Sequence, residues 1–160
     1  MGRQWFSISW LDGSPESEMA AGFRRSADIL DCYITEAMAE EGVGPSQTAL
    51  IGFSQGTMMS LHVAPRRTAP LAGVVGFSGR LPENENLRNE ALSKPPILLI
   101  HGDQDEMIPV AALGAAKAAL VDAGFQVQTH ISRGIGHGIA PDGLGLALGF
   151  LVEHLAPGSK

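Results

Sequence analysis

The sequence predicts an α/β protein, a parallel sheet of about four main strands with helices on both faces. Short apolar segments alternate along the chain with longer segments of helical periodicity. One apolar segment, Ile97–Ile100 (ILLI), has no polar position, as expected of a strand buried on both faces. The chain has 20 glycines, and many fall where apolar segments end, as expected of tight turns from a strand into a helix.

The first half of the chain predicts a long helix, a strand and a second helix. The long helix runs from about Pro15 to Glu41, with Ser14 as N-cap and Gly42 as the stop. Its apolar residues recur at helical spacing and predict one buried face: Met19, Phe23, Leu30, Ile34, Ala37 and Met38. A buried strand, Thr48–Ile51, and a helix from about Thr57 to Ala64 follow.

The second half predicts the remaining strands and two further helices. The strands are Leu71–Phe77, Ile97–Ile100 and Gln126–Ile131, and the helices are Val110–Asp122 and Asp142–Leu155. In the last helix we expect the inward-facing residues to be Leu144, Leu148, Leu151, Val152 and Leu155. The long irregular stretch Gly79–Pro95 leaves the carboxyl end of a strand, so we favour a substrate-facing lid over a plain surface excursion.

Composition excludes several classes of function. The 160 residues carry 17 acidic and 11 basic side chains, a formal charge of −6, with no Lys/Arg run, which disfavours nucleic acid and anionic membranes as partners. A single cysteine, Cys32, excludes an internal disulfide framework and a thiolate metal site. No apolar segment is long enough for membrane insertion, and residues 1–10 do not resemble a signal peptide, so we expect a cytoplasmic protein.

The segment Gly52-Phe53-Ser54-Gln55-Gly56 is a G-x-S-x-G motif between a predicted buried strand and a predicted helix. In this setting a sharp turn exposes the serine hydroxyl as a nucleophile. Only small residues two positions before and after Ser54 avoid a clash, and the start of the helix favours a developing oxyanion. The alternative is a glycine-rich turn in which the serine is incidental; the strand–turn–helix setting favours catalysis.

A nucleophilic serine needs a base, and five histidines are present. His62 falls in the helix after the motif, His130 in a strand and His154 in the last helix, while His101 ends the ILLI strand and is most simply a core residue. His137 lies in the glycine-rich loop GIGHG between the last strand and the last helix. That loop can carry an imidazole over the sheet, so we assign His137 as the base, with a surface loop histidine as the alternative.

The acid that orients the base is expected in HGDQDEMIP, directly after the ILLI strand. This segment offers Asp103, Asp105 and Glu106, and spacing alone does not choose between the two aspartates. An aspartate at a strand end is often a turn former that accepts backbone hydrogen bonds, and one of the two is expected to have that role.

Three segments, GFSQGTMMSL, HGDQDEMIPV and GIGHGIAPDGL, resemble the phospholipase/carboxylesterase family of α/β-hydrolases, which includes acyl-protein thioesterases. The resemblance runs from QWFSI to the last helix. It implies that Asp105, the second aspartate of H-G-x-x-D-x-x-V-P, is catalytic and that Asp103 forms the turn, with Ile108 in the valine position. It also implies a substrate-pocket wall at Trp5, and we expect substrate contacts from Phe53, Met107 and Ile108.

Compared with that family, the chain lacks several N-terminal strands and an H-G-x-G type loop that supplies one oxyanion amide. We therefore expect residues 1–160 to be a single α/β-hydrolase domain, incomplete at the N-terminus, with the amide of Gln55 as the remaining oxyanion donor. The strand Thr48–Ile51 would leave a bare apolar edge, a hazard for aggregation. Either the segment Trp5–Trp10 or a second copy of the chain would cover that edge, and we hypothesise a homodimer.

These features predict a serine carboxylesterase that hydrolyses short-chain carboxylic esters, small-molecule substrates, through an acyl-enzyme. Ser54 is the nucleophile, His137 the base and Asp105 the orienting acid, and neither a metal nor an organic cofactor is implied. One alternative is a non-catalytic truncated homologue that acts as a binding or interaction protein. Another is a thioesterase or lysophospholipase that uses the same three residues.

Overall fold

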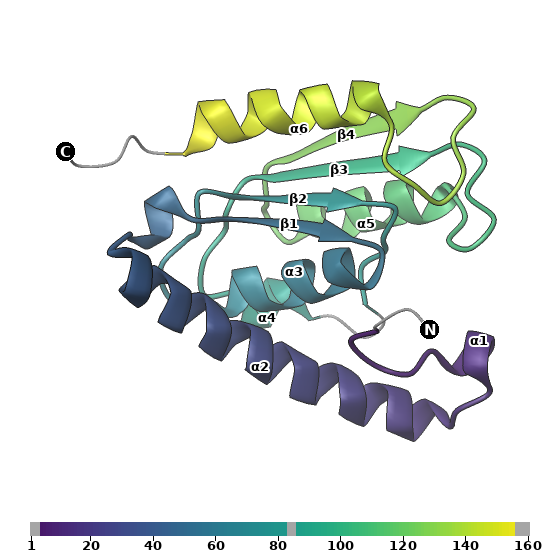
Figure 1. Ribbon diagram of the computed structural model, residues 1–160, viewed down its shortest axis with the longest axis horizontal. Helices are drawn as coiled ribbons and strands as arrows, with labels where there is room; N and C mark the ends of the chain where they lie inside the picture. Colours follow the sequence, from purple (N-terminus) through teal and green to yellow (C-terminus); the bar gives the residue numbers. More distant parts are fainter. Residues whose placement is uncertain (1–3, 83–85, 156–160) are drawn as a thin grey trace.

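The computed structural model describes residues 4–82 and 86–155 (Figure 1). Four parallel strands form one sheet and are ordered as they occur along the chain. They are β1 (Ala49–Phe53), β2 (Gly73–Phe77), β3 (Ile97–Gly102) and β4 (Val127–Ser132). Phe53 pairs with Phe77, and Phe77 with Ile100, so the carboxyl ends of the strands reach the same edge of the sheet. The predicted α/β fold with a parallel sheet is confirmed.

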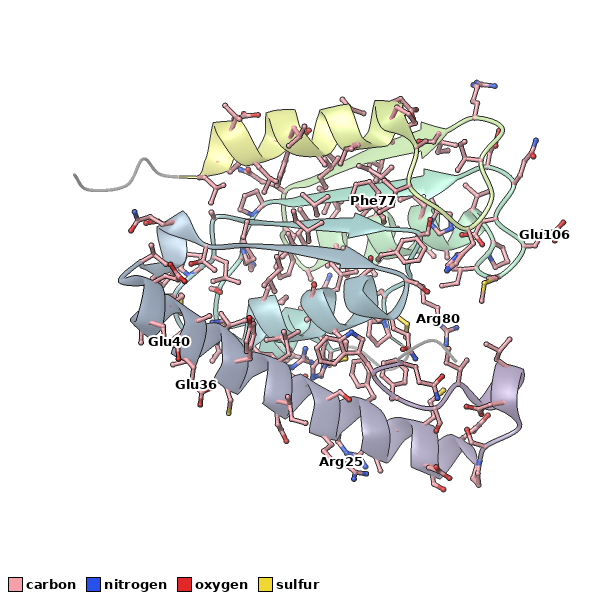
Figure 2. The ribbon with its side chains drawn as sticks, in the orientation of Figure 1. Arg25, Glu36, Glu40, Phe77, Arg80 and Glu106 are labelled. Atoms are coloured by element: carbon pink, nitrogen blue, oxygen red, sulfur yellow. The ribbon has the colours of Figure 1, made fainter. Side chains whose placement is uncertain are left out.

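Helices cover both faces of this sheet (Figure 1). The helical segments are α1 (Ser9–Asp12), α2 (Glu16–Glu41), the 3-10 turn η1 (Pro45–Gln47), α3 (Gln55–Arg66), α4 (Leu87–Glu90), α5 (Ala111–Asp122) and α6 (Pro141–His154). α3 and α5 pack on one face and α6 on the other, while α2 packs against the outer side of α3. The charged side chains of Arg25, Glu36 and Glu40 on α2 point away from the sheet (Figure 2).

Each face of the sheet has its own apolar core. On the α3 and α5 face, Met59 and Leu120 bury completely against Val74 of β2. On the other face, the side chain of Phe77 points from β2 toward α6 and packs in one cluster with Phe150 (Figure 2). A strand whose successive side chains enter two cores must be apolar throughout, which explains why β2 and β3 show no alternation of polar residues.

The inward face predicted for α6 was wrong at Leu144, Leu148 and Val152, which are exposed, whereas Leu151 packs against the core and Leu155 is half-buried. The buried residues of this helix are Gly143, Ala147 and Phe150, whereas Leu148 is 58% and Val152 83% exposed. Because the helix is apolar on nearly all sides, hydrophobicity alone does not show which face is buried. Close packing against the sheet selects the face with small residues. A Cβ on Gly143 would lie 2.8 Å from Cγ2 of Ile100, and the Phe150 ring lies where a Cβ on Gly73 would be.

The connection from β2 to β3 runs along α3. The backbone N–H groups of Leu92 and Ser93 both donate to the carbonyl of Pro65, in the last turn of α3. Ser54 lies at the opposite end of that helix, so residues 86–95 form a crossover and not a lid over the strand ends. The predicted lid also includes residues 83–85, which lie outside the described residues.

The described part of the segment before α2 is held at the start of α3, not along the free edge of β1. The backbone of Trp5 and Phe6 is held by the side chain of Gln55, at the start of α3, and Phe6 is buried in the core there. Within residues 4–82 and 86–155, β1 pairs with β2 alone, and Ile51 of β1 is 60% exposed. In the same part of the chain, no helix combines the length and the apolarity needed to cross a membrane.

Candidate active site

Ser54 sits on a strained turn between β1 and α3. Its φ is 53° and its ψ −113°, in a region that side chains other than glycine rarely occupy. Its N–H donates to the carbonyl of Phe77, and its own carbonyl accepts from the N–H groups of Thr57 and Met58. Strain of this kind costs about 1–3 kcal/mol and is typical of functional sites.

The two glycines of the motif have different roles. A Cβ on Gly52 would lie 2.4 Å from the carbonyl carbon of Gly56 and 2.5 Å from the nitrogen of Thr57, so only glycine fits there. A Cβ on Gly56 would meet nothing within 4 Å. The prediction that both positions must be small to avoid a clash holds for Gly52 and was wrong for Gly56, because the position two residues after Ser54 faces open space.

Asp105 and His137 lie in contact at the carboxyl edge of the sheet. Nδ1 of His137 is 2.8 Å from Oδ2 of Asp105, and the side chains are 14% and 0% exposed. Asp103 instead accepts the N–H of Gly134 at 2.7 Å and so ties down the start of the loop that carries His137. Glu106 points outward from its loop (Figure 2). The geometry thus distinguishes the two aspartates that spacing left open.

The Asp105 carboxylate is held in its charged form. Burial by itself would raise its pKa, but hydrogen bonds from the N–H of Ile108, the ring of His137 and the N–H of Met107 outweigh burial, and the pKa is lowered. The two backbone donors both act on Oδ1, at 2.8 Å and 2.9 Å. At neutral pH the site therefore presents a fixed negative charge to Nδ1 of His137.

His137 is placed over the end of β1. Its ring lies against Phe53, the residue before Ser54, with ring centroids 4.9 Å apart. The hydroxyl of Ser78 donates to the carbonyl of Gly138 at 3.2 Å, which holds the next residue of the loop. These contacts bring the His137 ring to the strand end that carries Ser54.

Ser78 is a site residue that the sequence analysis missed. It follows β2 as Ser54 follows β1, it is fully buried, and its φ is 45°. The signal is a repeated tripeptide, because Gly-Phe-Ser occurs at residues 52–54 and again at 76–78. Both copies end a parallel strand and turn the chain out of the sheet with a strained serine.

A small apolar cavity adjoins Ser54. Its volume is about 20 Å³, and its lining side chains come from the N-terminal segment, α3 and the loop after β3: Phe6, Ile8, Leu11, Ser54, Gln55, Met58, Met107 and Ile108. Two of the predicted substrate contacts, Met107 and Ile108, are in this set. The other two, Trp5 and Phe53, are not; they are 46% and 40% exposed. Sequence reasoning had no means to find Ile8 or Leu11, because their place depends on the path of the N-terminal segment.

Gln55 connects this cavity to the serine turn. Its side-chain oxygen accepts the N–H of Trp5 at 2.9 Å, and its side-chain nitrogen donates to the carbonyl of Phe6 at 2.8 Å. Ser26 of α2 donates to the carbonyl of Trp5 at 2.6 Å. The residue predicted to supply an oxyanion amide thus also fixes the cavity wall through its side chain.

A larger hollow of about 550 Å³ lies on the other side of that wall. Phe6 and Met58 line both spaces, and the larger one is also lined by residues of α2, α3 and the β2–β3 connection, including Arg24, Arg66 and Glu90. Among the residues that the structure describes, no group of three or more His, Cys, Asp or Glu side chains is arranged to hold a metal ion.

The fold and the site together define an α/β-hydrolase: a parallel sheet, a strained serine between a strand and a helix, and a histidine–carboxylate pair at the same edge. The sequence profile described as phospholipase/carboxylesterase matches residues 1–155. The chain belongs to the phospholipase/carboxylesterase family.

Named relatives agree with this assignment. The esterase YpfH of Escherichia coli (strain K12) is 35% identical over 157 residues, which cover 96% of this chain and 62% of that protein. Acyl-protein thioesterase 1 of Gibberella zeae is 28% identical over 162 residues, which cover 96% of this chain and 68% of that protein. The chain thus spans less than two thirds of the length of the bacterial esterase that it matches.

Solved structures show the same fold. The crystal structure of esterase PE8 matches with a TM-score of 0.88 and 42% identity, covering 96% of this chain and 71% of that one. The crystal structure of Arabidopsis thaliana SOBER1 matches with a TM-score of 0.81 and 26% identity, covering 96% of this chain and 75% of that one.

Proposed function

We propose that the protein is a serine carboxylesterase that hydrolyses short-chain carboxylic esters through an acyl-enzyme. The observation that carries the proposal is the strained Ser54 turn, with the His137–Asp105 pair at the same sheet edge. The names of an esterase and a carboxylesterase among its relatives support it.

In this mechanism, His137 takes the proton of Ser54 at Nε2, and the serine oxygen attacks the ester carbonyl. Asp105 accepts the Nδ1–H of His137 and so fixes its tautomer and balances the charge that develops on the ring. The N–H of Gln55 and the start of α3 stabilise the oxyanion. His137 then protonates the leaving alcohol and later activates the water that releases the acid.

The preference for short acyl chains follows from the cavity beside Ser54. Its volume of about 20 Å³ is close to what one water molecule needs, which suits the methyl group of an acetyl ester. Met107 and Ile108 would contact that methyl group, while Trp5 and Phe53, outside the cavity, would contact the alcohol portion. Turnover should fall from acetyl to butanoyl to octanoyl esters of p-nitrophenol, and a preference for the octanoyl ester would contradict this assignment.

The test of the activity is the removal of the Ser54 hydroxyl. Ser54→Ala should abolish turnover of p-nitrophenyl acetate and labelling by a fluorophosphonate probe, because both need an activated serine. Ser60→Ala is the matched control, since this hydroxyl on the same helix donates to the Gly56 carbonyl within α3. Full activity in Ser54→Ala, or no labelling of the folded wild-type chain, would refute the proposal.

A thioesterase is the second candidate, favoured by the acyl-protein thioesterase among the relatives. The same three residues would serve it, and only the leaving group differs. Comparison of an acetyl thioester with the matching oxygen ester, normalised for their uncatalysed hydrolysis, separates the two functions. A folded chain that turns over neither would favour the third candidate, a non-catalytic binding protein.

We also propose a cytoplasmic homodimer that pairs through β1. This strand has one partner in the described sheet, and an unpaired edge with an exposed apolar residue, Ile51, is suited to pairing with a second copy. Ile51→Lys should then lower the mass that light scattering reports at micromolar concentration. A monomeric mass for the wild-type chain would exclude the dimer.

A further inference from the structure

We propose that His101 is a positioning residue of the active site, whose ring N–H holds the turn that carries Asp105 and faces the Asp105 carboxylate. The proposal rests on the function proposed above, because it takes Asp105 as the residue that orients His137. His101 is the next-to-last residue of β3 and is 1% exposed. From the sequence it is most simply a core residue, but its ring nitrogen Nε2 faces polar atoms in the structure.

One ring nitrogen of His101 faces two oxygen atoms. Nε2 lies 2.8 Å from the carbonyl oxygen of Ile108 and 3.3 Å from Oδ2 of Asp105. Both oxygens accept hydrogen bonds, and a nitrogen lone pair at this position would repel them. Nε2 therefore carries a hydrogen and donates, with the shorter contact to Ile108.

Among the described residues, three hydrogen bonds hold the carboxylate itself. Oδ1 accepts from the N–H groups of Met107 and Ile108, and Oδ2 accepts from Nδ1 of His137. The hydrogen bond of His101 goes to the carbonyl of Ile108, the same residue whose N–H holds Oδ1, so His101 acts on the carboxylate through the turn. Its N–H also faces Oδ2 at 3.3 Å, where it adds a favourable electrostatic contact.

The orientation of the carboxylate matters because His137 needs Oδ2 at one place. If the Asp105 side chain rotates about its Cβ–Cγ bond, the hydrogen bond to Nδ1 is weakened and the imidazole loses its fixed tautomer. The backbone donors restrain Oδ1 only. His101, in the fully buried β3, ties the turn to the sheet through the Ile108 carbonyl and presents its N–H to Oδ2.

Three variants test this role. His101→Gln keeps an N–H close to the position of Nε2, whereas the side chain of His101→Asn is too short to place one there. The two variants have similar polarity and differ in whether a donor reaches that position. Leu98→Ala is the matched control, because it removes a buried side chain from the same strand but packs on the α6 face, away from Asp105. Thermal unfolding reports the structural cost of each change.

The first readout is the proton NMR resonance of the His137 Nδ1–H in the folded protein, which needs no activity. It should shift in His101→Asn, return toward its wild-type position in His101→Gln, and stay unchanged in Leu98→Ala. The second readout is fluorophosphonate labelling of Ser54, which should be about tenfold slower in His101→Asn than in His101→Gln, as expected for the loss of one hydrogen bond.

An unchanged His137 resonance in His101→Asn, with a lower unfolding temperature like that of Leu98→Ala, would make His101 a core residue only and overturn the proposal. Equal labelling rates in the Gln and Asn variants would also overturn it. If the wild-type chain is not labelled at all, the proposed hydrolase function fails, while the NMR comparison still decides whether His101 holds the carboxylate.

Discussion

Replacement of Gly52 by alanine should damage the active-site turn, whereas the same change at Gly56 should not. The added Cβ at Gly52 would lie 2.4–2.5 Å from three backbone atoms of Gly56 and Thr57, and backbone cannot swing aside as a side chain can. Ordinary contact distances begin near 3.4 Å, so the start of α3 must move away from β1 by about 1 Å.

The size of both effects follows from this clash. Forced overpacking costs about 1–3 kcal/mol, and at 3 kcal/mol the unfolding temperature of a chain of this length should fall by roughly 6–12 °C. A shift of about 1 Å at Ser54 should also lower turnover about 10²-fold. Gly56→Ala adds a methyl group in open space within a helix and should stabilise by up to about 1 kcal/mol.

The assay is thermal unfolding by circular dichroism, together with p-nitrophenyl acetate turnover for Gly52→Ala. The two substitutions are chemically identical and lie within one motif, so each controls for the other. If Gly52→Ala unfolds at the wild-type temperature, or Gly56→Ala loses as much stability as Gly52→Ala, the proposed packing of the turn is wrong.

Three further predictions concern the core, the acid and the cavity wall. In α6, Phe150→Ala should cost about 3–5 kcal/mol of unfolding free energy and Val152→Ser less than about 0.5; equal costs in denaturant titrations would contradict the observed phase of the helix. Because the pKa of Asp105 is lowered, the stability it contributes is present above about pH 3.9 and is lost as the pH falls through its folded pKa. Asp105→Asn should thus destabilise more at pH 7 than at pH 3 in urea unfolding, and a loss that does not depend on pH would count against a charged Asp105. Gln55→Ala removes two hydrogen bonds to the N-terminal segment but keeps the backbone amide. KM for p-nitrophenyl acetate should therefore rise about tenfold, while kcat changes less. A fall in kcat at constant KM would contradict a role of the Gln55 side chain in shaping the cavity wall.

The fold and the positions of the chemical groups could be predicted from the sequence where local signals were strong. The β1–turn–α3 unit was predicted from an apolar strand, two glycines and a helix, although most of β1 is half-buried or exposed and not buried as predicted. The segment ILLI placed β3 correctly, but the strand continues to Gly102, two residues past the predicted end. The phase of α6 could not be predicted, because a helix that is apolar on most sides has no preferred face until it packs. Its small residues, Gly143 and Ala147, identify the buried face only once a partner sheet is known.

The contacts of the candidate site are the other part that the sequence could not supply. His101 holds the carbonyl of Ile108, in the loop after its own strand. Gln55 and Ser78 hold backbone that is distant in sequence, at Phe6 and Gly138. No periodicity reports such a contact, because it depends on where loops from separate strands meet. Sequence patterns are most informative about groups that carry chemistry, and least about the groups that hold them in place.

The strain at Ser54 and Ser78 explains why many residues are needed to hold the site in place. Each residue is held at a positive φ that costs about 1–3 kcal/mol, at the ends of neighbouring strands. The turn at Ser54 would relax unless its neighbours opposed it, and the structure supplies these restraints: its N–H bonds to Phe77, and buried Thr57 bonds to Gly52 and Phe77. The restraints come from the ordered core of β2, which is buried along its whole length. Loss of packing in β2 should therefore lower the reactivity of Ser54 before it unfolds the chain. In a series of core variants of β2, the rate of fluorophosphonate labelling should fall at temperatures where circular dichroism still reports the folded protein.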